Sequence, residues 1–429
     1  MTDDGLLIVG SSQAGVQLAV SLRALGYEPP VTLLGDEDHR PYQRPALSKE
    51  FLQDKITKES LIFRTADYWA EHRITVVKNE RIEKIETGPD GSGTAHSASG
   101  RTFGFDRLAL TVGARARRLD VPGADLDGVL YLRNADDALE LKARAPKAER
   151  VVVVGGGFIG IEAAASLHTL GKHVTLVEFA DRLVARAVGE ATSAFLERHH
   201  RSVGIDVRLG ASVDAIRGED GAVRAVSVAG EEIPADIVLV GIGVVPNTEL
   251  AEQLDLEVDN GIVVDRFATA SDGHTLVVGD CANLPNPIPG SPAGQRVRFE
   301  SVNHAIEQAK VAAYAALGRT EDYAGVPWFW SNQGDLKLQI AGLSTGHDQV
   351  VDRSPDDPRK HSVLYYREGR LIAADCINVP LDFMIVKQAL GHQMLGSAVN
   401  LRADDVADPS VPLKPLLAEA VSAAEGNPS

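Results

Sequence analysis

The chain has 429 residues, 44% of them hydrophobic, which is enough for two or three domains that each bury a sizeable core. Its formal net charge of −17 argues against a nucleic-acid partner, because phosphate binding needs clustered Lys and Arg. Two cysteines, Cys281 and Cys376, are too few for a disulfide scaffold or a cysteine-based zinc site. No apolar run approaches the roughly 20 residues that span a membrane, and the N-terminus lacks a basic signal-peptide region. We expect a cytoplasmic protein that holds no metal.

The first predicted elements form a strand–helix–strand unit. The apolar run Leu6–Val9 leads into residues 10–15, Gly-Ser-Ser-Gln-Ala-Gly, and a helical pattern follows to about Gly26. A second strand is predicted at Val31–Leu34. A glycine-rich turn between a buried strand and a helix is typical of dinucleotide-binding folds, in which the helix N-terminus faces the pyrophosphate.

Single residues of this unit have distinct predicted roles. Gly10 makes the turn, Ser12 stands where a second glycine would let the backbone approach the phosphates, and Gly15 lets helix and strand pack closely. Asp36, or alternatively Glu37, ends the second strand and is expected to accept hydrogen bonds from a ribose. A solvated acid at a strand end is the other interpretation.

The same pattern returns further along the chain. Residues 151–154, all Val, lead into residues 155–160, Gly-Gly-Gly-Phe-Ile-Gly, and a helix is predicted over residues 161–170. Another strand follows at residues 174–177 and ends at Glu178. Two copies of the pattern, each followed by an acid, favour two dinucleotide sites over two ordinary strand–helix turns.

The second site is predicted to bind NADH. Gly155, Gly157 and Gly160 repeat the glycine roles of the first site. Glu178 would accept hydrogen bonds from the adenosine ribose and would repel the 2′-phosphate of NADPH, although the nearby Arg182 could weaken this preference.

Three further segments resemble the sequences of flavoproteins with two dinucleotide-binding domains. Residues 110–115, Leu-Thr-Val-Gly-Ala-Arg, resemble the strand and Ala-Thr-Gly turn of that superfamily. Residues 276–282, Leu-Val-Val-Gly-Asp-Cys-Ala, resemble its second flavin signature, in which an aspartate, here Asp280, caps the ribityl chain at a helix N-terminus. Residues 240–247, which include Gly243, look like the crossover from the NAD domain back to the FAD domain.

Within that superfamily the chain resembles the bacterial ferredoxin reductases of the putidaredoxin-reductase and rhodocoxin-reductase type. The resemblance is carried by residues 41–49, Pro-Tyr-Gln-Arg-Pro-Ala-Leu-Ser-Lys, by residues 299–305, Phe-Glu-Ser-Val-Asn-His-Ala, by residues 327–333, Pro-Trp-Phe-Trp-Ser-Asn-Gln, and by residues 411–414, Val-Pro-Leu-Lys. It extends from about residue 5 to about residue 417.

This resemblance implies an α/β protein of the glutathione-reductase-like kind, with two Rossmann-like dinucleotide-binding domains and a C-terminal α/β domain. The implied boundaries are residues 1–114 and 243–321 for a FAD domain built from two segments, 115–242 for the NAD domain, and 322–429 for the C-terminal domain. The flavin contacts that it implies are Ala14, Asp36, Lys49, Ile82, Arg133, Asp280 and Val302.

The absence of cysteine from residues 41–52 determines how electrons are expected to leave. Disulfide reductases of this superfamily carry a Cys pair there, and the related peroxidases carry one Cys. Cys281 is interpreted as a small buried residue of the flavin motif. Without a thiol relay, electrons must pass directly from the flavin to an external acceptor. A [2Fe–2S] ferredoxin fits, because flavin can release electrons one at a time.

Phe158, Glu162 and Lys49 are the expected catalytic residues. Phe158 and Glu162 are four residues apart where the helix of the NAD site opens, and they therefore share one face of it. The resemblance implies that Phe158 covers the flavin ring and that Glu162 pairs with Lys49 beside flavin N5, where an ammonium stabilises the charge left by hydride transfer. The alternatives are a core aromatic for Phe158 and a surface cation for Lys49.

Trp328 and Trp330 form the expected electron exit, because the resemblance places a tryptophan of this segment on the ferredoxin-facing side of the flavin. A core strand is the alternative interpretation of either residue. The ferredoxin is expected to be acidic, so a local basic patch of Arg296, Arg298 and Lys310 is the candidate docking surface.

Two other functions stay open. The flavin could serve an NADH dehydrogenase or oxidase that reduces quinone or dioxygen, but residues 413–429 are acidic and rich in alanine, unlike a basic membrane anchor. A non-catalytic flavoprotein with an interaction role is the second alternative, and the net charge disfavours nucleic acid as its partner. The sequence leaves open which ferredoxin is reduced, and whether a haem-thiolate monooxygenase or a Rieske dioxygenase follows.

Overall fold

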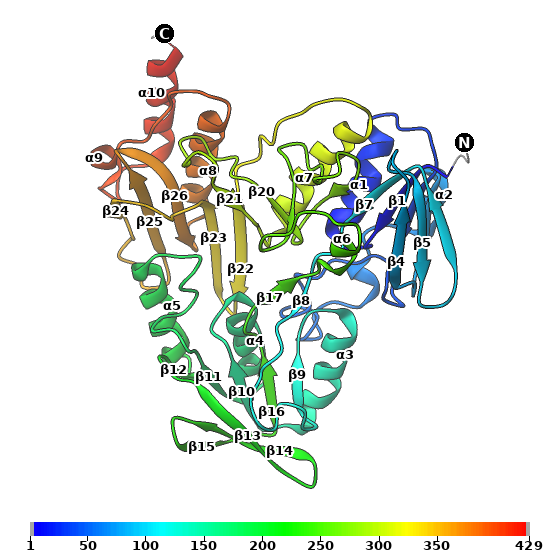
Figure 1. Cartoon of the computed structure of the whole chain (residues 1–429). Coiled ribbons are helices and arrows are strands. Elements are labelled where there is room, and N and C mark those ends of the chain that lie inside the picture. Colours follow the sequence, from blue (N-terminus) through cyan, green and yellow to red (C-terminus); the bar gives the residue numbers. More distant parts are fainter. Residues whose placement is uncertain (1–3, 426–429) are drawn as a thin grey trace. The chain divides into compact units, whose positions relative to one another are not determined.

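The structure is a computed structural model that describes residues 4–425 (Figure 1). The chain divides into two compact units, each built from three separate segments. The first unit contains Lys58–Arg115, Val245–Gly325 and the chain up to Gln43. The second unit contains Arg44–Thr57, Ala116–Val244 and the chain from Val326 onward. The domain boundaries given above stay predictions.

A parallel sheet forms the centre of the first unit. Its strands, in spatial order, are β19 (Leu276–Val277), β7 (Arg107–Leu110), β1 (Leu6–Val9), β2 (Val31–Leu34) and β3 (Ile74–Val77). All neighbouring strands run parallel. Two helices, α1 (Gln13–Ala24) and α7 (Val302–Ala316), pack against each other beside it.

Smaller elements complete the first unit. Its other strands are β4 (Ile82–Thr87), β5 (Gly93–Ser97), β6 (Thr102–Phe105), β18 (Ile262–Val263), β20 (Ala282–Pro285) and β21 (Arg296–Val297). Its short helices are η1 (Glu59–Leu61), α2 (Ala66–Glu71) and α6 (Glu249–Gln253). Strands β8 (Ala114–Ala116) and β17 (Val244–Pro246) pair where the chain passes from one unit to the other.

Both faces of the first sheet are covered, which explains why β1 is a continuous apolar run. Leu6 and Ile8 pack into one cluster with apolar residues of α1 and α7. Leu7 and Val9, which point to the opposite face, pack with residues of β4, β5 and β6. The apolar run therefore fixes β1 in the middle of the unit and places the turn after Val9 at the end of the sheet.

A second parallel sheet belongs to the second unit. Its strands, in spatial order, are β12 (Asp206–Arg208), β11 (His173–Val177), β10 (Arg150–Val154), β16 (Ile237–Val240) and β9 (Val129–Tyr131). The helices of this part are α3 (Ala135–Arg144), η2 (Ala145–Lys147), α4 (Phe158–Thr169) and α5 (Glu190–Ser202). A small antiparallel sheet is formed by β13 (Val213–Glu219), β14 (Ala222–Val228) and β15 (Glu231–Pro234).

An antiparallel sheet completes the second unit. Its strands, in spatial order, are β22 (Trp328–Gln333), β23 (Leu336–Gly342), β26 (Arg370–Ile377), β25 (His361–Arg367) and β24 (Gln349–Asp352). The accompanying helices are α8 (Pro380–Met394), α9 (Ala403–Val406) and α10 (Leu413–Glu425). Within the described residues, no helix is both long enough and apolar enough to cross a membrane.

Helix α4 is the central element of the second unit. It packs against β10 and β11 of the parallel sheet and against β22 of the antiparallel sheet. Ile161 and Leu167 of α4 share one apolar cluster with Ile340 of β23 and with Leu52 of the segment Arg44–Thr57. A helix covered on nearly all sides is expected to be apolar nearly all round, as this one is. Both predicted strand–helix–strand units, β1-α1-β2 and β10-α4-β11, are confirmed.

A buried carboxylate holds the N-terminus of α5 against the antiparallel sheet. Asp375 of β26 accepts hydrogen bonds from Tyr365 Oη (2.6 Å) and from the backbone N–H of Gly189 (3.2 Å), the residue that precedes α5. An anion is favoured at this end of a helix. Asp375 is nevertheless fully buried, and burial raises its pKa to about 6.

We expect Asp375→Asn to remove a pH-dependent cost of folding. Because the pKa of Asp375 in the folded chain lies above its unfolded value, the group stabilises the fold at low pH, and this stabilisation is lost as pH rises through about 6. The loss between pH 5 and pH 8 is on the order of 1 kcal/mol. The free energy of unfolding in urea should therefore fall less steeply with pH in Asp375→Asn than in the wild type. Asp125→Asn, at an exposed carboxylate of the same unit, should keep the wild-type slope, and equal slopes in all three proteins would contradict this account.

Candidate functional site

The two glycine-rich turns have the same backbone geometry. Gly10 and Gly155, which follow β1 and β10, have φ angles of 115° and 109°, a region that favours glycine. A Cβ atom on Gly10 would lie 2.3 Å from the carbonyl oxygen of Thr111. A Cβ atom on Gly155 would lie 2.4 Å from the carbonyl oxygen of Gly241. Each turn therefore approaches the end of the neighbouring strand too closely for any side chain.

The third glycine of each motif lets the helix approach the turn. A Cβ atom on Gly15 would lie 2.0 Å from the carbonyl oxygen of Gly10. The corresponding distance from Gly160 to the carbonyl oxygen of Gly155 is 1.9 Å. These contacts give the steric reason for the close packing of helix and strand that the motif predicts.

The residues that precede the two helices suit a bound pyrophosphate. Ser12 and Gly157 are the N-cap residues of α1 and α4, and in the described part of the chain neither makes a side-chain capping bond. Neither helix has an acidic residue in its first turn. A Cβ atom on Gly157 would meet no atom within 4 Å, so the backbone there is open to a ligand. The N-terminus of α4, beside this open backbone, fits the phosphates of NADH, and the N-terminus of α1 is the corresponding position for those of FAD.

The structure distinguishes the two acids at the end of β2. Glu37 already accepts a hydrogen bond from Tyr42 Oη at 2.6 Å. Asp36 is exposed, at the end of the strand that follows the glycine turn. Asp36 is therefore the more exposed of the two acids, and its role as the ribose acceptor of the first site stays a prediction.

Glu178 stands at the end of β11, beside the second glycine turn. Its carboxylate accepts hydrogen bonds from the backbone N–H groups of Gly156 and Ala180. Arg182, which could have favoured a 2′-phosphate, uses its guanidinium within the chain. It donates to the carbonyl oxygens of Ala185 (2.7 Å) and Val188 (2.8 Å) and to Ser193 Oγ (2.9 Å).

The turn that contains Asp280 contacts a helix from a distant part of the sequence. No helix begins at this residue in the described chain; it lies in a turn between β19 and β20. The nearest helical partner is α7, because the N–H of Gly279 donates to Gln308 Oε1 at 2.8 Å. Helix α7 itself begins at Val302 and is capped by Ser301, whose Oγ accepts from the N–H of His304. The contact between Gly279 and Gln308 joins the motif to α7, and the role of Asp280 stays a prediction.

The other predicted nucleotide contacts are distributed over both units. Ala14 is the second residue of α1, and Ile82 is the first residue of β4; both are buried. Arg133 belongs to the second unit, where its carbonyl oxygen accepts from Arg44 Nη1 at 2.8 Å. Gly243 follows β16 with a φ of 96°. The roles of these residues stay predictions.

Lys49 and Glu162 form a buried ion pair in the second unit. Lys49 Nζ lies 2.8 Å from Glu162 Oε2, and the two residues are 6% and 2% exposed. The pairing expected from the sequence is therefore present, and Lys49 is not a surface cation. Two hydroxyl groups complete the shell: Ser48 Oγ donates to Glu162 Oε2 and Ser331 Oγ donates to Glu162 Oε1, each at 2.6 Å. Ser48 and Ser331 were not predicted, although both lie in the segments that carry the family resemblance.

Aromatic side chains gather along β22. Phe158, at the start of α4, contacts the ring of Phe329 with centroids 4.3 Å apart. The rings of Trp328 and Trp330 lie 5.3 Å apart, and both residues are partly exposed. Lys387 of α8 places its ammonium 4.5 Å from the centre of the Trp328 ring. Both tryptophans thus lie on a sheet strand, yet neither is fully buried.

The predicted basic patch is only partly available to a partner. The Arg298 side chain is 10% exposed; it pairs with Glu300 at 2.8 Å and donates to the carbonyl oxygen of Asp280. Arg296 donates to the carbonyl oxygens of residues 264 and 283. Lys310 is more exposed and pairs with Glu307. Arg298 stays a predicted partner contact, but its charge is already paired within the chain.

Burial shifts the pKa values of the two thiols and of His304. Cys281 and Cys376 are fully buried, and burial raises the pKa of Cys281 to about 12 and that of Cys376 well above its usual value. Burial also lowers the pKa of His304 to about 4, and its ring packs against Phe299 and Tyr323. His304 is therefore neutral at pH 7. In the described chain, no cluster of His, Cys, Asp or Glu could hold a metal ion.

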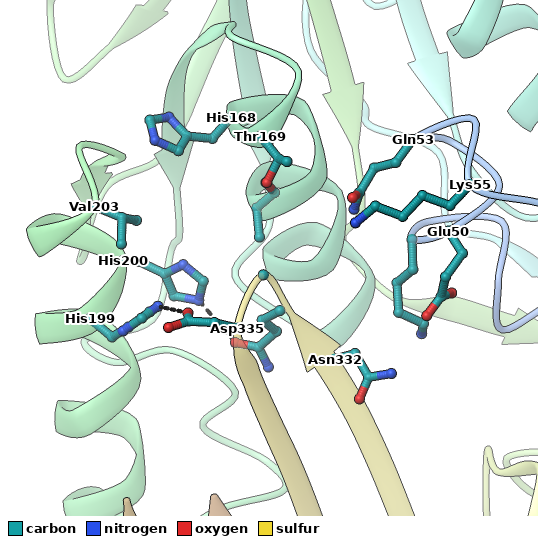
Figure 2. Close-up of a pocket in the computed structure, with 14 residues that line it drawn as sticks. Glu50, Gln53, Lys55, His168, Thr169, His199, His200, Val203, Asn332 and Asp335 are labelled. Carbon is teal, nitrogen blue, oxygen red and sulfur yellow. Dashed lines mark hydrogen bonds and ion pairs between the residues drawn. The ribbon is translucent and has the colours of Figure 1, made fainter. Parts of the chain in front are cut away.

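A cavity of about 290 Å³ lies in the second unit at the C-terminal half of α4 (Figure 2). Its lining residues include His168, His199, His200 and Asp335, and the His199 ring nitrogen lies 3.2 Å from the Asp335 carboxylate. Burial lowers the pKa of His200 to about 4, and its Nε2 is hydrogen-bonded to Gln333 Oε1 at 2.9 Å. Because the glycine turn lies at the opposite end of α4, this cavity is separate from the nucleotide turn.

Comparison with known proteins gives full-length matches. The chain matches the family described as pyridine nucleotide-disulphide oxidoreductase over residues 5–309, and that described as reductase C-terminal over residues 328–417. It is 42% identical over 390 residues to rhodocoxin reductase of Rhodococcus erythropolis, covering 91% of this chain and 90% of that protein. It is 38% identical over 422 residues to a ferredoxin–NAD(P)+ reductase of Sphingomonas, covering 96% and 98%. The chain is also similar in structure to a chain of the solved covalent complex of putidaredoxin reductase with putidaredoxin. The match covers 99% of this chain and 99% of that chain, with 35% identity and a TM-score of 0.90.

These matches confirm the predicted α/β architecture with two dinucleotide-binding folds and a C-terminal domain. The chain belongs to the pyridine nucleotide-disulphide oxidoreductase family and carries its reductase C-terminal domain.

Proposed function

We propose that the chain is an NADH:ferredoxin oxidoreductase, which uses FAD to pass electrons from NADH to a [2Fe–2S] ferredoxin. Relatives named rhodocoxin reductase and ferredoxin–NAD(P)+ reductase support this proposal, because they are similar over nearly their whole length. So does the likeness to a reductase that was solved in covalent complex with putidaredoxin. The ferredoxin would serve a haem-thiolate monooxygenase or a Rieske dioxygenase, and we propose a cytoplasmic location.

The state of the two thiols is the observation that carries this proposal. A thiolate, not a thiol, is the reactive form of cysteine. Burial raises the pKa of both Cys281 and Cys376, so both are protonated at neutral pH. A member of a disulphide oxidoreductase family that has no usable thiol must give its electrons to an external acceptor.

The second unit supplies the proposed NADH contacts. The N-terminus of α4 faces the pyrophosphate, and Gly157 lets the backbone approach it. Glu178 accepts hydrogen bonds from the adenosine ribose and would repel a 2′-phosphate. The guanidinium of Arg182 is used within the chain, so it supports no preference for NADPH.

In the first unit, the N-terminus of α1 and Asp36 are the proposed contacts of the FAD pyrophosphate and ribose. When bound, FAD supplies the chemistry that the side chains lack, taking up a hydride and releasing electrons singly.

Glu162 and Lys49 act together in this proposal. Lys49 is the proposed cation that stabilises negative charge after hydride transfer. A buried ammonium needs a partner, because an unpaired charge out of water is costly. Glu162 supplies that partner, and the hydroxyl groups of Ser48 and Ser331 donate hydrogen bonds to its carboxylate in place of water.

An NADH dehydrogenase or oxidase that reduces quinone or dioxygen is the alternative that keeps the flavin. The partly exposed pair Trp328 and Trp330 favours a protein acceptor, since aromatic residues provide contact area at interfaces. A non-catalytic interaction role has no supporting feature in the described chain. A flavin-loaded preparation assayed with NADH against several ferredoxins, quinone and dioxygen tests the proposal, and the proposal fails if no ferredoxin is reduced.

NADH should outperform NADPH by one to two orders of magnitude in kcat/KM, which corresponds to roughly 1.4 to 3 kcal/mol. The reason is repulsion between Glu178 and the 2′-phosphate. Glu178→Ala should narrow the difference, as measured by flavin reduction with each nucleotide. Equal kcat/KM values in the wild type would show that Glu178 does not select the nucleotide.

Lys49→Ala should slow flavin reduction by NADH by about two to three decades, the typical loss of one positioned charge. Stopped-flow absorbance measures this step directly. Lys55→Ala is a matched control, because Lys55 is exposed on the same segment. In this variant NADH should reduce the flavin at the wild-type rate. If Lys49→Ala retains FAD and its flavin is reduced by NADH at the wild-type rate, Lys49 has no role in this step.

Replacing both Cys281 and Cys376 by Ser should leave electron transfer from NADH to ferredoxin largely intact, because neither thiol carries electrons. Trp330→Ala should impair ferredoxin reduction while sparing reduction of the flavin by NADH, and Trp330→Phe should be milder. Single-turnover measurements separate the two half-reactions. The direct mechanism is wrong if the cysteine double variant keeps FAD and its fold but no longer reduces ferredoxin.

A further inference from the structure

Phe179 is the most exposed large apolar side chain in the part of the chain that the structure describes. It is 80% exposed, although it follows a strand whose apolar residues are buried. Single exposed apolar residues are common on protein surfaces and need no special explanation. Phe179 differs from that background because of where it lies and how firmly its backbone is held.

The backbone on both sides of Phe179 is fixed. The N–H of Glu178 donates to the carbonyl oxygen of Arg208 (2.8 Å), and the carbonyl oxygen of Glu178 accepts from Ala211 (3.0 Å). The carbonyl oxygen of Ala180 accepts from Gly210 (2.8 Å). Ala180 also donates to the Glu178 carboxylate (2.7 Å). An aromatic ring on a fixed backbone has only two rotatable side-chain bonds, so little entropy is lost when a ligand covers it.

This fixed segment adjoins the second glycine turn. The Glu178 carboxylate accepts from the N–H of Gly156, and the carbonyl oxygen of Gly156 accepts from the N–H of Val184 at 3.0 Å. Glu178 is the proposed acceptor for the adenosine ribose, and adenine is joined directly to that ribose. The base must therefore lie within reach of the residue next to Glu178.

We infer that Phe179 forms one wall of the adenine subsite, with its ring against the face of the base. This inference rests on the proposed use of NADH and adds a residue that contacts its adenine. Base–aromatic contacts are tolerant of base identity and contribute substantially to binding. Phe179 would thus act on affinity for the adenosine half of the nucleotide and not on hydride transfer.

The test compares two fragments of the nucleotide on the flavin-loaded protein. ADP-ribose contains the adenosine half without nicotinamide, and reduced nicotinamide mononucleotide contains the reactive half without adenosine. In Phe179→Ala, the Kd for ADP-ribose, measured by calorimetry, should rise about tenfold. The rate of flavin reduction by the mononucleotide should stay unchanged, and Phe179→Trp should retain ADP-ribose affinity.

Leu395→Ala is the matched control, because Leu395 is an apolar residue of similar exposure, 77%, in the same unit. It should bind ADP-ribose as the wild type does. Unchanged ADP-ribose affinity in Phe179→Ala would overturn the inference while leaving the proposed function intact, and so would an equal loss with the mononucleotide. If the wild type itself does not bind ADP-ribose, the proposed use of NADH fails, and this inference fails with it.

Discussion

The buried carboxylate of Glu162 is the constraint on which the second unit depends. A charge removed from water must be paired and hydrogen-bonded, or it costs several kcal/mol. Its donors come from two segments far apart in sequence: Ser48 and Lys49 of Arg44–Thr57, and Ser331 of β22. Satisfying one carboxylate therefore fixes both segments on α4, whose N-terminus also forms the nucleotide turn. The ion pair proposed for hydride chemistry and the turn proposed for NADH are thus positioned by a single helix.

Local sequence was sufficient to predict the elements that bind nucleotides. The turns at Gly10 and Gly155 are determined by steric contacts within a few residues and with the adjacent strand, so their glycines predict them. Long-range packing was not predictable in the same way. The segment Arg44–Thr57 groups with the second unit because Leu52 enters its apolar cluster, and no local pattern indicates that. The motif around Asp280 likewise did not indicate which helix lies beside it, because α7 follows only after two further strands.

The candidate site shows the same division. The spacing of Phe158 and Glu162 predicted a shared helix face, and the Lys49–Glu162 pair is present. Burial and partners depend on the whole fold, so sequence alone could not show that the charge of Arg298 is already paired, nor that Phe179 is exposed. The structure therefore adds mainly two kinds of information about function: which charged groups are already paired within the chain, and which aromatic rings are exposed.

The central claim is that electrons leave this protein directly for a one-electron protein acceptor. An anaerobic titration that counts the ferredoxin reduced for each NADH oxidised tests it most directly, with the flavin spectrum recorded throughout. A hydride carries two electrons and a [2Fe–2S] cluster accepts one, so the account predicts that two ferredoxin molecules are reduced per NADH. NADH oxidation that proceeds only when dioxygen or a quinone is admitted, with the ferredoxin left oxidised, would contradict it.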